Sequence, residues 1–369
     1  MEHTKERLQS IDALRGFDMV WIMGAPWLVQ ALYVIFGGEI LHNFHLQMEH
    51  VSWNGFHWMD LVFPLFLFIS GMSFPYSLEH KRKKNESNKT ILIELIRRAI
   101  ILVVLGIIYN GFLKLNFNET RYASVLGHIG IAWFFASVIY LYTSKMYTLL
   151  FWFAGIIIVY GAINLIFISP FAISADHFIP ENNIVCQFDR WFLPGILYNK
   201  IYDPEGILSI IPAISTALLG MITTRYMKEY MHLSFKVKTA TYLTIGAALI
   251  LLSLLVNLII PINKALWSSS FVLLTGGISI LLFFFFYWII DVLKWRKWAF
   301  FFRVIGVNTI LIYMAQSIIN FYGISEFFLG GIASKVSKNG ASLILSVGYI
   351  GACWLFLYFL YRKKIFLKV

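Results

Sequence analysis

Long apolar stretches recur along the chain, and short polar segments separate them. Ten of these stretches are about 20 residues long, which is the length that a helix needs to cross a bilayer. They cover residues 14–36, 54–78, 91–113, 122–142, 147–168, 206–224, 238–260, 268–290, 303–321 and 341–361. Residues 323–334 are apolar but shorter, so we expect an interfacial or re-entrant piece there. The pattern predicts an all-α polytopic membrane protein with about ten transmembrane helices in a single domain, residues 1–369.

The composition favours a membrane protein over a soluble one. Hydrophobic residues make up 59% of the chain and aromatic residues 18%, whereas charged residues make up 13%. The mean hydropathy is +0.73. Soluble domains contain about 25% charged and about 45–50% apolar residues. The bilayer is therefore the expected environment of most of the chain.

The net charge of +11 is distributed as membrane topology requires, which argues against a nucleic-acid partner. With a cytoplasmic N-terminus, the cytoplasmic segments hold 23 of the 30 Lys and Arg residues. The other seven face the outside, and they are Lys114, Arg121, Arg190, Lys200, Lys264, Lys335 and Lys338. This excess of positive charge inside predicts that both termini are cytoplasmic, and that residues 37–53, 114–121, 169–205, 261–267 and 322–340 lie outside.

Several function classes lack their sequence signals. A cleavable signal peptide is not expected, because Asp12, Arg15 and Asp18 interrupt the region where its apolar core would lie. Cys186 and Cys353 are too few for a metal site, and they would form a disulfide only if the fold brought them together. No P-loop, GxGxxG, CxxC set or HExxH motif occurs, so we expect no metal and no nucleotide loop of these kinds.

Polar chemistry is concentrated at the mouth of the second predicted span. His50, Trp53 and Asn54 precede the span, and Asp60 lies inside it, ten residues after His50. A histidine exchanges protons near neutral pH, while an amide and a carboxylate can orient it or hold an oxyanion. The alternative is an ordinary interfacial belt, where histidine and tryptophan are common.

A second polar group lies in the first predicted span and the arm before it. Asp12 and Arg15 are three residues apart, so they share one helix face and can pair. The alternative is a simple interfacial helix start, with Ser10 as its N-cap and Arg15 on lipid phosphates. Asp18 needs a partner or water, because an unpaired charge at mid-bilayer costs roughly 2.5–3.5 kcal/mol.

The outer loops and the ninth span carry the remaining candidates. Asp203 and Glu205 flank a proline just before a span, where helix capping is the alternative to binding a cationic amino sugar. Asn308 and Gln316 lie inside the ninth predicted span, where hydrogen bonding between helices is the alternative to lining a site.

Five separated motifs occur in the order found in one family. They are R-L-x-S-x-D-x-x-R-G (7–16), H-x-S-W-N-G-x-x-x-x-D-L-V-F-P-x-F-x-F-I-x-G (50–71), Y-D-P-E-G-I-L (202–208), P-I-N-K-x-L-W-S-x-S (261–270) and G-V-N-T-I-L-I-Y (306–313). Together they resemble the heparan-α-glucosaminide N-acetyltransferase family, in its bacterial branch without the large luminal domain. The resemblance implies a transmembrane enzyme that takes acetyl-CoA from the cytosol and acetylates an amino sugar on the other side.

The resemblance also implies roles for individual residues. The family's active histidine falls on His50, while Asp60, Asp12 and Arg15 occupy family positions with supporting or cofactor-side roles. We add Asn54 to the catalytic set because of its amide. Residues expected on the acceptor side are Trp53, Asp189, Asp203, Glu205, Lys264 and Asn308. Cations at inner helix ends, where the anionic end of coenzyme A is expected, are Arg15, Arg97, Arg98 and Arg303; anchoring by the positive-inside rule is their alternative.

The chain departs from the family pattern at three places. The segment between Gly16 and His50 is longer, the expected Gln-Arg of the fourth span is Gly127-His128, and the family histidine near the end of the ninth span is Gln316. Any family role at these positions is therefore in doubt.

Coenzyme A does not cross a bilayer, so two routes to His50 are open. Either the pantetheine arm threads the helices and His50 is a general base, which we favour, or His50 carries the acetyl group as a nucleophile. We expect an enzyme of a bacterial inner membrane, with its active-site mouth extracytoplasmic. The rivals are a transporter of a sugar or acyl donor and an O-acyltransferase of a surface polysaccharide. A homodimer is left open.

Overall fold

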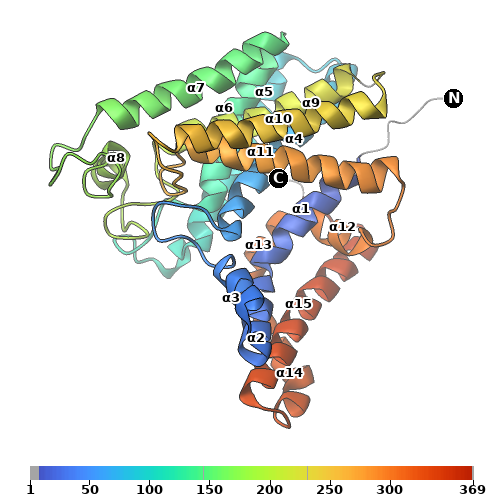
Figure 1. The fold of residues 1–369 in the computed structure, drawn as a ribbon. Helices are drawn as coiled ribbons and strands as arrows, with labels where there is room; N and C mark the ends of the chain where they lie inside the picture. The colour runs from blue at the N-terminus through green and yellow to red at the C-terminus, as the bar shows by residue number, and fades with distance from the viewer. Residues whose placement is uncertain (1–7, 144, 231, 368–369) are drawn as a thin grey trace. The chain divides into compact units, whose positions relative to one another are not determined.

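Helices dominate the computed structural model, which describes residues 8–143, 145–230 and 232–367 (Figure 1). The described part contains no β-strand, only three isolated bridges. Contacts group the chain into two compact units. Unit 1 comprises residues 1–51, 57–62 and 282–368, and unit 2 comprises residues 52–56 and 63–281. The prediction of a single domain stays a prediction, and each unit is described by itself.

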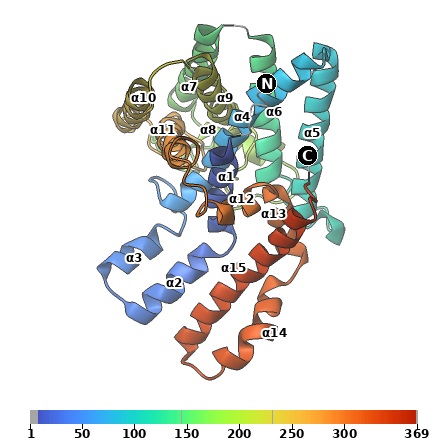
Figure 2. The same cartoon turned by 90° about the vertical axis from the view of Figure 1, so that its right-hand side faces the viewer.

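Unit 1 joins the two ends of the chain. Its helices are α1 (Gln9–Ile22), α2 (Ala25–Phe36), α3 (Glu39–Leu46), the first turn of α4 (Trp58–Lys83), the end of α11 (Ser269–Tyr287), η2 (Trp288–Val292), α12 (Phe300–Gly306), α13 (Thr309–Ile318), α14 (Phe321–Ala333) and α15 (Lys338–Arg362). Figure 2 shows α14 beside α15 and α2 beside α3. The core of unit 1 includes Met19, Val304, Ile305 and Cys353, which are fully buried or nearly so.

Unit 2 contains the central part of the chain. It is built from most of α4, then α5 (Asn88–Tyr109), η1 (Phe112–Lys114), α6 (Val125–Tyr142), α7 (Met146–Ile166), α8 (Ile184–Phe192), α9 (Ile210–Glu229), α10 (Phe235–Val256) and most of α11. In this unit α6 packs against α5 and α9, and α9 also packs against α7. A Cβ on Gly71 or Gly220 would overlap a backbone oxygen of the facing helix, so glycine allows α4 and α9 to approach closely.

The all-helical architecture is confirmed, and the described residues contain seven to nine candidate membrane spans. Seven helices are long and apolar enough to cross a membrane, and two bent helix pairs raise the number to nine. The predicted span 91–113 corresponds to α5, which carries Glu94, Arg97 and Arg98. Ten spans, and the placement of both termini in the cytoplasm, therefore stay predictions. Residues 323–333 belong to the short apolar helix α14, and the re-entrant or interfacial placement of this segment stays a prediction.

Two predicted spans are broken rather than continuous. The first bends by 56° between α1 and α2, where Gly24 has a φ of +95° and Pro26 lies in the first turn of α2. Glycine adopts this conformation without strain, and a proline fits the start of a helix but not its interior. The ninth bends by 74° between α12 and α13, at Val307 and Asn308.

The start of α1 differs from the expected cap. Ser10 is not the N-cap, because α1 begins at Gln9 with Leu8 as its N-cap. The backbone N–H of Ser10 instead donates to Asp291 Oδ2 at 3.1 Å. A carboxylate from η2 thus satisfies a donor that the first turn of a helix leaves unpaired. Arg7, the first residue of the first motif, lies outside the described residues.

Candidate active site

His50 and Asp60 form a hydrogen-bonded pair at the predicted site, and both belong to unit 1. His50 Nδ1 lies 2.7 Å from Asp60 Oδ1. Asp60 is fully buried, whereas the His50 side chain is 50% exposed. The pair therefore connects a buried carboxylate with an imidazole that solvent reaches.

The local sequence explains why Asp60 holds this position. It lies in the first turn of α4, where backbone N–H groups and the helix dipole favour a negative charge. The segment before the helix folds over it, so that its Oδ2 accepts hydrogen bonds from the backbone N–H of His57 at 3.0 Å and of Val51 at 3.4 Å. With Asp60 fixed at Nδ1, the imidazole is oriented to exchange a proton through Nε2.

Asn54 belongs to unit 2, where it contacts the fourth sequence motif. Its Oδ1 accepts a hydrogen bond from Asn263 Nδ2 at 3.0 Å. Next to it, Gly55 N donates to Ile262 O at 2.8 Å, and Gly55 has a φ of +124°, which favours glycine. The structure thus brings together two motifs that lie about 200 residues apart, and sequence reasoning had not singled out Asn263.

Trp53 is fixed in unit 2 by the long outer loop. Its Nε1 donates to Phe178 O at 2.5 Å, and its ring centroid lies 4.7 Å from that of Tyr202. The hydroxyl of Tyr202 also donates to Ser52 O at 3.4 Å. Two aromatic rings of unit 2 therefore lie together beside the segment that follows His50.

Asp203 and Glu205 bind an arginine of the same unit. The guanidinium of Arg121 donates to Asp203 through Nε at 2.7 Å and through Nη2, which also donates to Glu205. Asp203 accepts further bonds from the N–H groups of Tyr198 and Glu205, both at 3.0 Å. Capping of the next helix is therefore not their use, because α9 begins only at Ile210.

Burial and charge shape the ionisation of this ion-pair cluster. Burial raises the pKa of Glu205, and the positive charge of Arg121 opposes that rise. Burial works against the charge on Arg121, but the hydrogen bonds and charges of Asp203 and Glu205 raise its pKa overall. Sequence reasoning counted Arg121 only as one of the outer cations. Arg121 lies directly before a predicted span, as Asp203 and Glu205 do, and this shared position could have indicated that they pair.

His128 lies where the family pattern is broken, and unit 2 buries it. Its ring centroid lies 5.2 Å from that of Phe63 and 5.0 Å from that of Trp267. Within the described residues, neither ring nitrogen has a hydrogen-bond partner. Aromatic rings pack against it, and the segment of Asp203 and Glu205 also interacts with it, so any family role at this position stays in doubt.

Asp189 lies on α8 and ties that helix to the segment before α9. Its Oδ1 accepts a hydrogen bond from Ile207 N at 2.8 Å, and the side chain is almost fully buried. Burial raises the pKa of Asp189 to about 7. Lys264, another predicted acceptor-side residue, interacts electrostatically with Glu205. Unit 2 thus brings several acceptor-side candidates into one charged region.

The Asp189 carboxyl predicts a pH-dependent stability. An unfolded aspartate releases its proton near pH 4, but the folded one retains it to about pH 7. The folded state therefore binds more protons in this window, so the unfolding temperature should fall as pH rises from about 4 to 8. The unfolding temperature of Asp189→Asn should lack this part of its dependence on pH. Tryptophan fluorescence during heating, at several pH values, measures it.

The control for this prediction is the exposed carboxylate of Asp176 in the same outer loop. Asp176→Asn should keep the wild-type pH slope. An unchanged slope in Asp189→Asn would contradict the argument from burial.

The predicted cofactor-side residues are divided between the units. In unit 1, Arg15 Nη1 lies 3.5 Å from Asp12 Oδ1, so the expected pair is confirmed. The same Nη1 also donates to Gly306 O at 3.5 Å. Arg303 lies on α12, the helix that packs against α1. In unit 2, Arg98 lies over the ring of Trp133, 4.0 Å from its centroid. Arg97 is exposed on the same helix, α5.

Close packing of α1 and α12 depends on one glycine from each of two motifs. A Cβ on Gly16 would overlap Phe302 O, and a Cβ on Gly306 would overlap Asp12 O. The motif residues Arg15-Gly16 and Gly306-Val307 therefore meet because the backbones approach to a distance that only glycine allows.

The polar residues of the ninth span make hydrogen bonds within unit 1. Asn308 Nδ2 donates to Ile365 O at 2.9 Å, and its Oδ1 accepts from Leu367 N at 3.0 Å. Gln316 Oε1 accepts from the hydroxyl of Tyr349 at 2.9 Å. These contacts match the hydrogen-bonding alternative, and the acceptor-side role of Asn308 stays a prediction.

Metal and disulfide chemistry have no support among the described residues. No group of three or more His, Cys, Asp or Glu side chains in that part of the chain is arranged to hold a metal ion. Cys186, in unit 2, and Cys353, in unit 1, are each buried with a free thiol.

Known proteins resemble the chain over different lengths. A family model described as a domain of unknown function (DUF5009) matches residues 7–115. Heparan-alpha-glucosaminide N-acetyltransferase of Homo sapiens is 26% identical over 98% of the chain, and that of Mus musculus is 25% identical over the same share. The chain spans about 60% of the length of these curated relatives. The domain match covers the N-terminal part of the chain, and the similarity to the two N-acetyltransferases extends over almost all of it.

Proposed function

We propose that the protein is a transmembrane N-acetyltransferase, which moves the acetyl group of acetyl-CoA to the amine of an amino sugar. The observation that carries this proposal is the 2.7 Å hydrogen bond between the half-exposed His50 and the buried Asp60. A base and the group that orients it are what acyl transfer to an amine requires. The names of the two curated relatives supply the reaction class.

His50 acts as the general base in the direct route. As the sugar amine attacks the thioester carbonyl, Nε2 of His50 accepts the proton that the amine loses. The C–S bond then breaks, the amide forms, and the proton passes to the sulfur of coenzyme A. Asp60 keeps the imidazole oriented and stabilises its positive charge. Asn54 is proposed to donate its amide N–H to the developing oxyanion.

The donor side of the proposal rests on unit 1. Buried polar atoms along α1 and beside it have no hydrogen-bond partner among the described residues. They include the Ser10 hydroxyl, both carboxyl oxygens of Asp18, and the indole N–H groups of Trp21 and Trp58. Burying such groups without partners is costly, and the amides and hydroxyl of a pantetheine arm have the chemistry to pair with them.

Cations at the same unit are proposed to meet the anionic end of coenzyme A. Arg15 and Arg303 lie on the packed helices α1 and α12. A guanidinium binds phosphate through two parallel hydrogen bonds, which suits a diphosphate. In unit 2, taken by itself, Arg97 and Arg98 of α5 stay the predicted cations for this anionic group.

The acceptor side of the proposal rests on unit 2. Trp53 and Tyr202 offer aromatic faces on which a sugar ring can pack, and Asn54 offers an amide. Asp203, Glu205 and Asp189 are proposed to favour a cationic amino sugar, and Lys264 to balance their charge. Because Arg121 already pairs with Asp203 and Glu205, their attraction for a cation is smaller than the sequence suggested.

The proposal also includes the location of the reaction. We place the enzyme in a bacterial inner membrane, and the distribution of Lys and Arg puts acetyl-CoA on the cytoplasmic side and the acceptor on the other. An extracytoplasmic glucosamine or glucosaminide is the acceptor class that this topology offers.

A transport assay separates the enzyme from its non-enzymatic rival. Two broken spans, α1–α2 and α12–α13, are a feature that transporters use, although both belong to unit 1 rather than to two matching halves. Proteoliposomes with acetyl-CoA inside and glucosamine outside should release the free thiol of coenzyme A inside and N-acetylglucosamine outside. Movement of either compound without an acetylated product would favour the transporter.

The same vesicles test the second enzymatic rival and the acyl route. An ester product, which mild alkali cleaves, would identify an O-acyltransferase, whereas the proposed amide resists it. Rapid quenching with labelled acetyl-CoA should leave no label on the protein if transfer is direct. Labelled protein that forms and decays at the turnover rate would instead assign the acetyl group to His50.

A further inference from the structure

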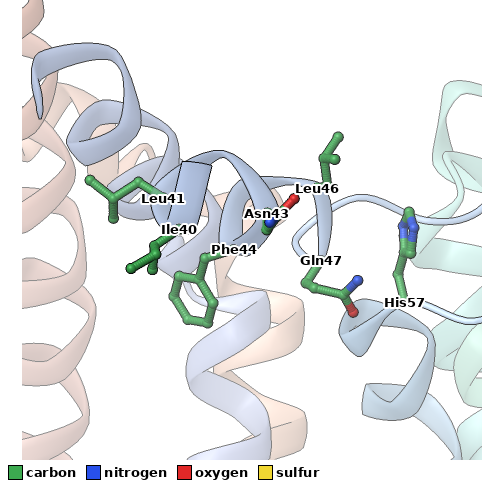
Figure 3. A pocket seen from close by; sticks show the side chains of 7 residues that line it. All are labelled: Ile40, Leu41, Asn43, Phe44, Leu46, Gln47 and His57. Carbon is green, nitrogen blue, oxygen red and sulfur yellow. The ribbon is translucent and has the colours of Figure 1, made fainter. Parts of the chain in front are cut away.

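An open pocket in unit 1 lies next to the His50–Asp60 pair. Its volume is about 580 Å³, and the helix α3 supplies most of its lining (Figure 3). The helix α3 lies between Gly16 and His50, in the segment that is longer here than in the family that the sequence resembles. The family resemblance therefore assigns this pocket no role.

The helix α3 is turned so that its apolar side is exposed. Gly37 and Gly38, with φ of +62° and +88°, reverse the chain after α2. His42 and His45 then pack on the ring of Tyr33 in α2, with ring centroids 5.2 Å and 5.5 Å apart. No residue of α3 is buried. A helix with polar groups toward its neighbour and apolar groups outward is arranged for lipid, not for water.

The pocket changes from apolar to polar along its length. Ile40, Leu41 and Phe44 lie at one end, Gln47 and His57 lie at the other end beside Leu46, and Asn43 lies between them (Figure 3). Ile40 is 85% exposed and Phe44 is 45% exposed. Phe36, the last residue of α2, is also exposed. A ligand that fits this gradient has a hydrocarbon chain and a polar head.

The polar end leads to the catalytic pair through two hydrogen bonds. His57 N donates to Asp60 Oδ2 at 3.0 Å, and Asp60 Oδ1 binds His50. Gln47 fixes the same corner, because its Oε1 accepts from Trp58 N at 2.9 Å and its backbone O accepts from Met59 N at 3.1 Å. A polar head in this end of the pocket would thus contact His57, the residue whose backbone N–H binds the carboxylate that orients His50.

We propose that this pocket binds the hydrocarbon chain of a membrane-resident acceptor, so that the enzyme acetylates an amino sugar carried on a lipid. This inference rests on the proposed function and narrows its substrate class. Ordinary phospholipid could also cover an apolar surface. The position of the polar end at His57, whose backbone N–H binds Asp60, favours a chain that is attached to the reacting sugar.

The test is a series of glucosaminides with methyl, propyl and butyl aglycones, assayed with acetyl-CoA in nanodiscs. If the added carbons enter the pocket, kcat/KM should rise by up to about fourfold per buried methylene. Ile40→Ser and Phe44→Ser should flatten this rise, because they replace the apolar end by polar groups.

Phe328→Ser is the matched control, since Phe328 is an exposed apolar residue of α14 outside the pocket. It should keep the wild-type dependence on chain length, and thermal unfolding should show that all three variants are folded. A flat wild-type series would overturn the inference, and so would a rise that Ile40→Ser and Phe44→Ser share with the control, because simple partitioning into lipid would then explain it.

Failure of the inference and failure of the proposed function differ in this experiment. Transfer to methyl glucosaminide without any gain from longer chains rejects only the lipid-carried acceptor. Absence of transfer to every member, including free glucosamine, rejects both.

Discussion

Acetyl transfer should fall by roughly 10²–10⁴-fold when His50 is replaced by alanine, because the reaction loses its general base. The side chain lies on the protein surface at the site and is half exposed, so the fold should tolerate the change. The measurement is the rate of coenzyme A thiol release with glucosamine, for purified wild type and variant at equal acetyl-CoA concentration.

His232→Ala is the matched control for this variant. His232 is exposed between α9 and α10 and belongs to none of the proposed sites. It should retain the wild-type rate. A folded His50→Ala protein that is as active as this control would remove His50 from the mechanism, although it would leave the reaction class intact.

Asp60→Asn extends the same prediction to the group that orients the base. The amide keeps the size of the side chain but cannot stabilise a positive imidazole, so kcat should fall while KM for the acceptor changes little. The double variant His50→Ala/Asp60→Asn should be no slower than His50→Ala alone, because the two residues act as one unit. Additive losses would argue that they act separately.

Removal of the Arg121 charge should produce the largest loss of stability. Arg121→Gln leaves Asp203 and Glu205 buried without their cation, and breaking a buried ion pair in this way costs about 3–5 kcal/mol. The free energy of unfolding, from denaturant or thermal unfolding in detergent, is the quantity to compare.

The size of this loss should depend on pH. The two carboxyls of the variant can become neutral at low pH, so the deficit should be smaller at pH 5 than at pH 8. Lys200 is an exposed cation in the outer loop that also contains Asp203 and Glu205. Lys200→Gln should change the free energy of unfolding by no more than about 0.5 kcal/mol. A deficit for Arg121→Gln as small as that of Lys200→Gln would show that the cluster is not held by this charge.

The triple variant Arg121→Met/Asp203→Asn/Glu205→Gln separates two explanations. If the loss in Arg121→Gln comes from unpaired carboxylates, neutralising all three groups should recover much of it. If it comes from lost packing of the arginine on Tyr198, whose ring centroid lies 4.9 Å from the guanidinium carbon, the triple variant should stay as unstable.

The long apolar stretches predicted the helices, because a segment inside a bilayer must form its backbone hydrogen bonds within its own helix. The predicted boundaries lie within a few residues of most helices, such as 238–260 for α10 (Phe235–Val256). The two bends were not predicted from these stretches. Gly24 and Pro26 gave a signal for the first, but hydropathy does not record a bend. The second lies at Asn308, whose side chain binds the backbone of the C-terminal segment, and such a long-range bond leaves no local signal.

The candidate site was predictable where its residues are close in the sequence. His50 and Asp60 are ten residues apart, with a helix start between them, and the structure joins them by a hydrogen bond. Arg121 was not predicted, because its partners lie more than 80 residues away and only packing brings them together. The contact between Asn54 and Asn263 has the same origin.

The sequence by itself determined the helical membrane class, the position of its apolar stretches and the candidate base with its carboxylate. These features follow from local chemistry, since hydrophobic length and the charge preference of a helix start are written in neighbouring residues. Only the tertiary structure decided which charges pair, where spans bend and how the apolar side of α3 forms a pocket. Apart from the signal of Gly24 and Pro26 at the first bend, those outcomes depend on contacts between distant segments.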